Sequence, residues 1–184
     1  MAYYVRKIAR SKWCTLEQDA ANTLSNYKAD TIANDLKTSS NTLSLWKVES
    51  LSIEDTEPII VVNSLLGDTI SKIDLLFIPE SCLAQFTLEQ SDGNTVVSQC
   101  IDRHYNVVSL TVRSHLLFAH SVILPLLAQA AASSGNGNII RRYSEKAQLV
   151  LLEKWIADGR LDFDDLKEKQ QNAILTYRQR QVGH

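Results

Sequence analysis

Two cysteines and three histidines are the side chains of this sequence that could combine to do chemistry. Cys100, His104, His115 and His120 are the residue types that bind zinc, and three such ligands with a bound water would form a hydrolytic site. The spacing argues against this site. Residues five positions apart on a helix point about 140° away from each other, so His115 and His120 would not share a helix face. We therefore predict no metal and no cofactor.

A cysteine nucleophile is the other catalytic possibility. Cys82 follows an apolar segment, residues 73–78, that is typical of a buried strand, and a helix beginning there would lower the pKa of the thiol. Cys100 and His104 offer a corresponding cysteine–histidine pair. No G-x-S-x-G motif is present, and the acidic clusters lie at predicted helix starts, where the helix dipole explains them. The sequence favours a non-catalytic protein, with a small cysteine- or zinc-dependent hydrolase as the alternative and Cys82, Cys100 and His104 as its candidate residues.

Four basic residues near the start are interleaved with aromatic ones, a combination that can bind single-stranded nucleic acid; they are Arg6, Lys7, Arg10 and Lys12. In a strand, however, Arg6 and Lys7 point to opposite faces, which disperses the patch. The net charge of the chain is −2, so no overall field attracts nucleic acid. Nucleic-acid binding through this arm is a second alternative.

Residues 114–132 contain no Lys, Arg, Asp or Glu and are long enough to span a membrane. Two histidines, Gln129 and Pro125 make the segment too polar for a convincing span. We predict instead a helix that is buried on several faces as the central support of the fold, with an oligomer interface as the alternative. Pro125 is expected to kink or split this helix. The odd number of cysteines and the polar start of the chain predict a cytoplasmic protein without membrane contact.

Hydrophobic patterning predicts both strands and helices. The strands are expected at residues 2–8, 42–48, 73–78 and 106–112, with a hairpin formed by 86–90 and 95–100. Helices are expected at 14–24, 30–36, 53–66 and 144–157, with a last helix that begins after Asp162. The predicted fold class is α+β, or irregular α/β: a small mixed sheet packed on a long apolar helix, with a C-terminal αα-hairpin. The predicted division is a core domain over 1–138 and a helical hairpin over 139–184, which is either part of the same compact unit or a docking appendage.

No motif in the sequence is specific enough to indicate a family. We predict a non-catalytic protein-binding or assembly subunit of a bacterial multi-component system, of the kind found in toxin–antitoxin and phage-defence (antiviral) loci. Its partner is expected to be a larger protein or a second copy of the chain. The amphipathic hairpin is suited to docking, and the expected contact residues are Trp155, Phe163, Leu166, Ile174 and Tyr177.

Overall fold

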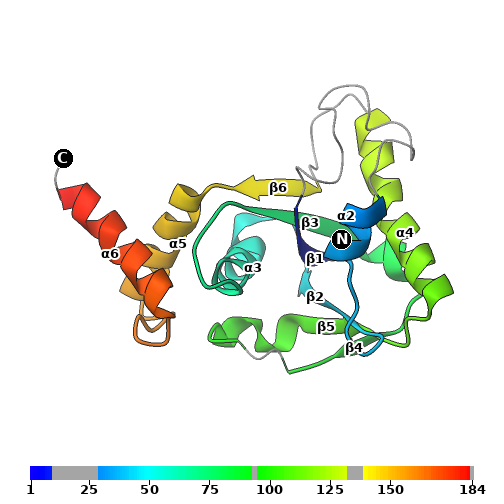
Figure 1. The fold of residues 1–184 in the computed structure, drawn as a ribbon, viewed down its shortest axis with the longest axis horizontal. Coiled ribbons are helices and arrows are strands. Elements are labelled where there is room, and N and C mark those ends of the chain that lie inside the picture. Colours follow the sequence, from blue (N-terminus) through cyan, green and yellow to red (C-terminus); the bar gives the residue numbers. More distant parts are fainter. Residues whose placement is uncertain (10–28, 93–94, 132–138, 183–184) are drawn as a thin grey trace.

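The computed structural model describes residues 1–9, 29–92, 95–131 and 139–182. Within these ranges the chain forms one six-stranded sheet in the order β4-β5-β2-β1-β3-β6 (Figure 1). All five strand pairings are antiparallel. The strands are β1 (Tyr3–Ile8), β2 (Leu43–Val48), β3 (Ile73–Pro79), β4 (Leu88–Gln90), β5 (His104–Val107) and β6 (Ile140–Tyr143). The α+β prediction is confirmed.

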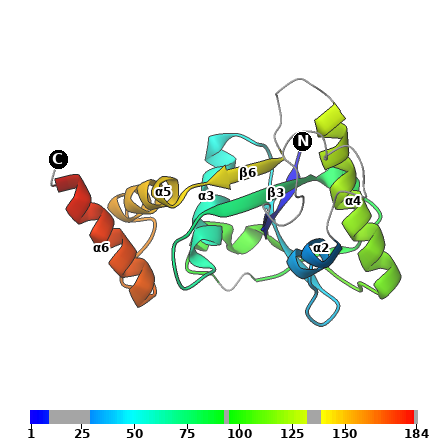
Figure 2. The ribbon, with the colours of Figure 1, turned by 45° about the horizontal axis from the view of Figure 1, so that its top comes forward.

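Helices cover both faces of this sheet. One face carries α3, and the other carries α2 and α4, while α5 and α6 lie together at one end of the molecule (Figure 2). The helices are α2 (Ala29–Asp35), α3 (Ile53–Leu65), α4 (Val112–Ala131), α5 (Glu145–Ala157) and α6 (Glu168–Val182). Two short 3₁₀ helices, η3 (Glu80–Leu83) and η4 (Ser98–Arg103), complete the described elements.

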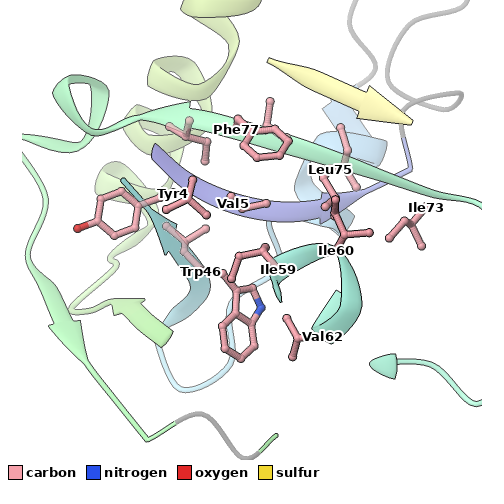
Figure 3. Close-up of a cluster of buried hydrophobic side chains, with 14 of the residues drawn as sticks. Tyr4, Val5, Trp46, Ile59, Ile60, Val62, Ile73, Leu75 and Phe77 are labelled. Carbon is pink, nitrogen blue, oxygen red and sulfur yellow. The ribbon is translucent and has the colours of Figure 1, made fainter. Parts of the chain in front are cut away.

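The core is formed where α3 packs against the centre of the sheet. Six of the seven residues of β3 are buried, as expected for a strand that is covered on both faces. Val5 of β1 and Phe77 of β3 are opposite each other in the sheet, and both are fully buried. Ile59 and Ile60 of α3 belong to the same cluster (Figure 3).

Local capping signals explain where two of the helices begin and end. The Ser52 hydroxyl accepts a hydrogen bond from the Asp55 amide at the start of α3, and Ser144 does the same for Ala147 at the start of α5. Gly159 has a φ of 67° just after α5, a conformation that costs glycine little and other residues more. The helix predicted over residues 144–157 is therefore confirmed.

The predicted hairpin of residues 86–90 with 95–100 is wrong. Strand β4 pairs with β5 instead, and residues 98–103 form η4. Val97 and Cys100 are fully buried there, so this segment contributes to the core as a compact turn. The last helix also begins later than expected, at Glu168, because Asp162 caps only a local turn by accepting a hydrogen bond from the Asp164 amide. The predicted helix at 14–24 lies outside the described residues.

Helix α4 differs from its prediction in position. It is one continuous helix through Pro125, and it lies at the edge of the molecule, not at its centre (Figure 1). Phe118 and Val122 are buried, but Leu116 on the opposite side is 65% exposed. Among the described residues, the apolar side chains of α4 are therefore buried on one side of the helix and exposed on the other. Among the described residues, no helix has the length and apolar character needed to cross a membrane.

Candidate binding surfaces

The outer side of α4 carries a stripe of exposed apolar side chains. Four residues, which we call the α4 stripe, are between 44% and 82% exposed: Val112, Leu116, Leu117 and Leu124. At 3.6 residues per turn the four positions spread over about 140° of the helix circumference, so together they cover the outer half of α4 and do not form a single row. The inner side is fixed by Phe118, whose ring meets that of Phe86 edge-on at 5.3 Å. This packing leaves the stripe directed away from the core.

Helix α4 itself contains no acidic residue. Arg113 is the one Lys, Arg, Asp or Glu residue of α4, and it is exposed. His120 is also exposed on this helix. The sequence contains no acidic residue between Asp102 and Glu145. A complementary surface would therefore be apolar with an acidic margin.

A second apolar surface lies between α3 and α5. It is a groove of about 480 Å³, which we call the α3–α5 groove. Ile53 is 66% exposed and Val150 is 46% exposed, and both line it together with Ile60 and Leu151. Lys146 is the cation on its margin. Helices α3 and α5, which line this groove, lie apart from α4 along the long axis of the molecule (Figure 1).

The α3–α5 groove depends on a buried carboxylate that holds the two helices together. Glu57 of α3 accepts hydrogen bonds from Trp155 Nε1 at 2.6 Å and from Lys154 Nζ at 3.1 Å. Arg160 Nη1 lies 3.3 Å from the same carboxylate, and its guanidinium stacks 3.7 Å from the centre of the Trp155 ring. Burial by itself raises the pKa of Glu57, but these hydrogen bonds and charges bring the pKa below its ordinary value. The carboxylate is thus kept ionised and paired.

Most of the residues predicted to contact a partner are buried within the chain itself. Trp155 and Ile174 are fully buried and Leu166 is 6% exposed. Phe163 and Tyr177 are half-buried, and the Arg178 guanidinium lies 5.3 Å from the Phe163 ring. Partner contact by the hairpin remains a prediction, and it would have to use Phe163, Tyr177 and their exposed neighbours.

The two described cysteines are poorly suited to act as nucleophiles. Cys100 is fully buried, and its thiol donates to the backbone oxygen of Pro58 at 3.4 Å. Burial raises the pKa of Cys100 to about 12. Burial also raises the pKa of Cys82, which is half-buried. Both thiols therefore hold their protons near neutral pH, whereas the thiolate is the reactive form.

The three histidines that follow Cys100 have separate environments. The His104 ring packs against the Trp46 ring with 4.7 Å between centres, and His115 Nε2 lies 2.8 Å from the backbone oxygen of Leu36. His120 is exposed on α4. Among the residues that the structure describes, no three His, Cys, Asp or Glu side chains come together as a metal site.

The two basic residues of β1 point to opposite faces of the sheet. Arg6 donates to the backbone oxygens of Asp35 and Ser44, at 3.1 and 2.9 Å. Lys7 contacts the backbone oxygen of Asn63, at the C-terminal part of α3. Arg10 and Lys12 lie outside the described residues. A nucleic-acid surface across Arg6 and Lys7 would need both side chains on one face.

Lys7 instead lines a small polar recess that the sequence did not indicate. The recess has a volume of about 250 Å³ and brings Lys7 together with Trp46, His104 and Asn63. These residues are far apart in the chain and become neighbours only through strand register. The sequence also does not indicate the α4 stripe, because the other sides of α4 are almost as apolar as the exposed one.

No family model, curated protein or solved structure matches this chain, so its function has to be argued from these surfaces.

Proposed function

We propose that the protein is a non-catalytic binding subunit that docks a larger protein partner through the α4 stripe. The observation that carries this proposal is the exposure of four large apolar side chains on one side of α4. Burying a leucine side chain is worth about 1.5–3 kcal/mol, so a group of exposed leucines leaves considerable free energy for association. Contiguous apolar patches of this kind are typical of interaction sites.

The chemistry of the stripe defines the partner surface. An amphipathic helix with leucine-like side chains on one face and acidic residues along its flanks would pair with the α4 stripe and with Arg113. The α3–α5 groove could hold a second apolar segment. A subunit with two such surfaces can bridge components of an assembly. A setting in a bacterial multi-component system of the toxin–antitoxin or phage-defence kind stays a prediction.

The test is a set of single substitutions that place a carboxylate on an exposed apolar position. Partners captured by the wild-type chain are identified by mass spectrometry, and the affinity of the purified partner is then measured for each variant. Leu116→Glu is expected to weaken binding by about 30-fold or more, the effect of losing one central contact. Val96→Glu is the matched control, because Val96 is 45% exposed and lies outside α4.

Two results would contradict this assignment. If Leu175→Glu on α6 abolishes binding while Leu116→Glu does not, the helical hairpin is the docking surface, as the sequence predicted. If light scattering shows a homodimer that Leu116→Glu converts to a monomer, the stripe serves self-association. Circular dichroism should show that each variant is folded, because the substituted side chains are all largely exposed.

A further inference from the structure

The polar recess is built on the α3 side of the sheet by three neighbouring strands. Val5 of β1 is opposite Trp46 of β2, and Trp46 is opposite His104 of β5. Side chains two positions apart in a strand share a face, so Lys7 extends on the same side as Val5. Asn63 and Leu66 from the C-terminal end of α3 form the facing wall. The result is a cavity of about 250 Å³ beside the core.

A chain of hydrogen bonds holds the His104 ring at one side of the recess. Ser44 Oγ donates to Asn106 Oδ1 at 2.9 Å, and Asn106 Nδ2 donates to Ser91 Oγ at 3.0 Å. Ser91 Oγ lies 2.6 Å from His104 Nδ1. In one of the two neutral tautomers of His104 the Ser91 hydroxyl donates to Nδ1, and the ring hydrogen is then on Nε2. Burial lowers the pKa of His104 and favours the neutral ring, while a hydrogen bond with the Ser91 backbone acts in the opposite direction.

Lys7 brings a cation to the same recess without a matching carboxylate. Its one hydrogen bond is a long contact of 3.4 Å to the Asn63 backbone oxygen. Among the described residues no Asp or Glu lies within ion-pair distance of Lys7 Nζ. Burial lowers the pKa of Lys7, and no neighbouring charge opposes that effect. An ammonium group has three donors, so at least two remain for a ligand.

We propose that this recess binds a small oxyanion, a carboxylate or a phosphate group, held by Lys7 Nζ and by the His104 ring in its Nε2–H tautomer. The Trp46 ring and the Leu66 side chain supply an apolar wall for the rest of a small organic acid or phosphate ester. The recess, at about 250 Å³, is smaller than most ligand sites and suits only a compact molecule. The site is independent of the α4 stripe and of the proposed partner binding.

The test uses the full chain with inorganic phosphate and with acetate as probes. The ring carbon–hydrogen signal of His104, assigned by its loss in His104→Gln, is followed by NMR during each titration. Saturable movement at millimolar concentration is expected for the oxyanion that fits, as two charge-assisted or polar contacts to a small ion imply. A response to phosphate alone identifies a phosphate site, and a response to acetate alone identifies a carboxylate site.

Thermal unfolding provides the matched comparison. Phosphate at about ten times its dissociation constant should raise the melting temperature of the wild type by roughly 3 °C more than it raises that of Lys7→Met. Lys72→Met, which removes an exposed lysine at the start of β3, should behave as the wild type and corrects for the general stabilising effect of phosphate. All samples are compared with chloride at the same ionic strength.

The proposal is overturned by either of two results. One is a His104 signal in the wild type that does not move saturably with phosphate or with acetate, and this decides the matter even if Lys7→Met does not fold. The other is an equal rise in melting temperature for the wild type and a folded Lys7→Met with whichever anion, phosphate or acetate, moves the His104 signal.

Discussion

Single side chains in this protein join segments that are far apart in the sequence. Glu57 accepts hydrogen bonds from donors about one hundred positions later, and Trp155 Nε1 is the closest of them at 2.6 Å. Gln170 links distant segments at the other end of α3, where its side-chain amide donates to the backbone oxygens of Leu65 and Gly67. A buried carboxylate or amide that is fully paired fixes one arrangement, because any other arrangement leaves a buried polar group unpaired.

Glu57→Gln should lower the free energy of unfolding by about 1–3 kcal/mol at pH 7, because the Lys154 and Arg160 charges lose their buried partner. The pKa of Glu57 in the folded protein lies below the ordinary value of 4.5, so the stabilisation is fully present above that pH. It is lost as the pH falls through the folded pKa. The difference between Glu57→Gln and the wild type should therefore shrink below about pH 4.

Urea unfolding followed by tryptophan fluorescence at pH 7 and pH 3.5 measures this difference. Glu54→Gln is the control, because Glu54 lies on the exposed side of the same helix. An equal difference at both pH values would show that the charge of Glu57 does not stabilise the fold.

Cys100 should react with iodoacetamide at least about a hundred times more slowly than Cys82 in the folded protein. Cys100 has no exposed surface and a pKa of about 12, whereas Cys82 is partly exposed. Peptide mass spectrometry after timed labelling measures both rates. Comparable rates would instead restore Cys100 as a candidate nucleophile.

At the scale of elements, residues at both ends of α5 determine where the helix begins and ends. Ser144 caps its first turn and Gly159 follows its last residue, with a φ of 67°. The helix then contributes Trp155 to the Glu57 cluster, so its register along the chain decides whether the indole reaches the carboxylate. Helix α4 is the opposite case. Its composition predicted a long helix, but it did not predict which side of that helix packs against the sheet.

Gly159→Ala should lower the free energy of unfolding by about 1 kcal/mol, because an alanine is strained at a positive φ. A Cβ at Gly159 would meet nothing within 4 Å, so the cost is one of backbone conformation alone. Gly67→Ala is the control: its Cβ would make an ordinary 3.5 Å contact with the Thr69 oxygen, and a change within about 0.5 kcal/mol is expected. Equal effects in chemical denaturation would contradict the backbone explanation.

For the molecule as a whole, the order of the sheet places β1 between β2 and β3 and brings the start of the chain into the core. Strand β6 joins the same sheet, so the segment after residue 138 contributes to the core before it continues into α5 and α6. Helix α5 binds one end of α3 through Glu57, and α6 binds the other end through Gln170. Helices α3 and α4, which carry parts of the two apolar surfaces, lie on opposite faces of the sheet (Figure 2).

Gln170→Ala should release the start of α6 without loosening the sheet. The backbone oxygens of Leu65 and Gly67 would lose their side-chain donor, while no strand pairing changes. Hydrogen exchange measured by mass spectrometry should rise across residues 168–182 and stay unchanged in β1 and β3. An equal rise in the central strands would show that the hairpin and the sheet unfold as one cooperative unit.

The sequence by itself determined the α+β class and most element positions, because alternation, capping residues and glycine act within a few residues of one another. It also predicted that the Arg6 and Lys7 side chains point to opposite faces of the sheet, since adjacent residues of a strand do so. Only the tertiary structure decided that residues 98–103 turn into the core, that α4 leaves one side exposed, and that Lys7 and His104 share a recess. Each of these depends on strand register and on contacts between distant segments, which local patterns do not specify.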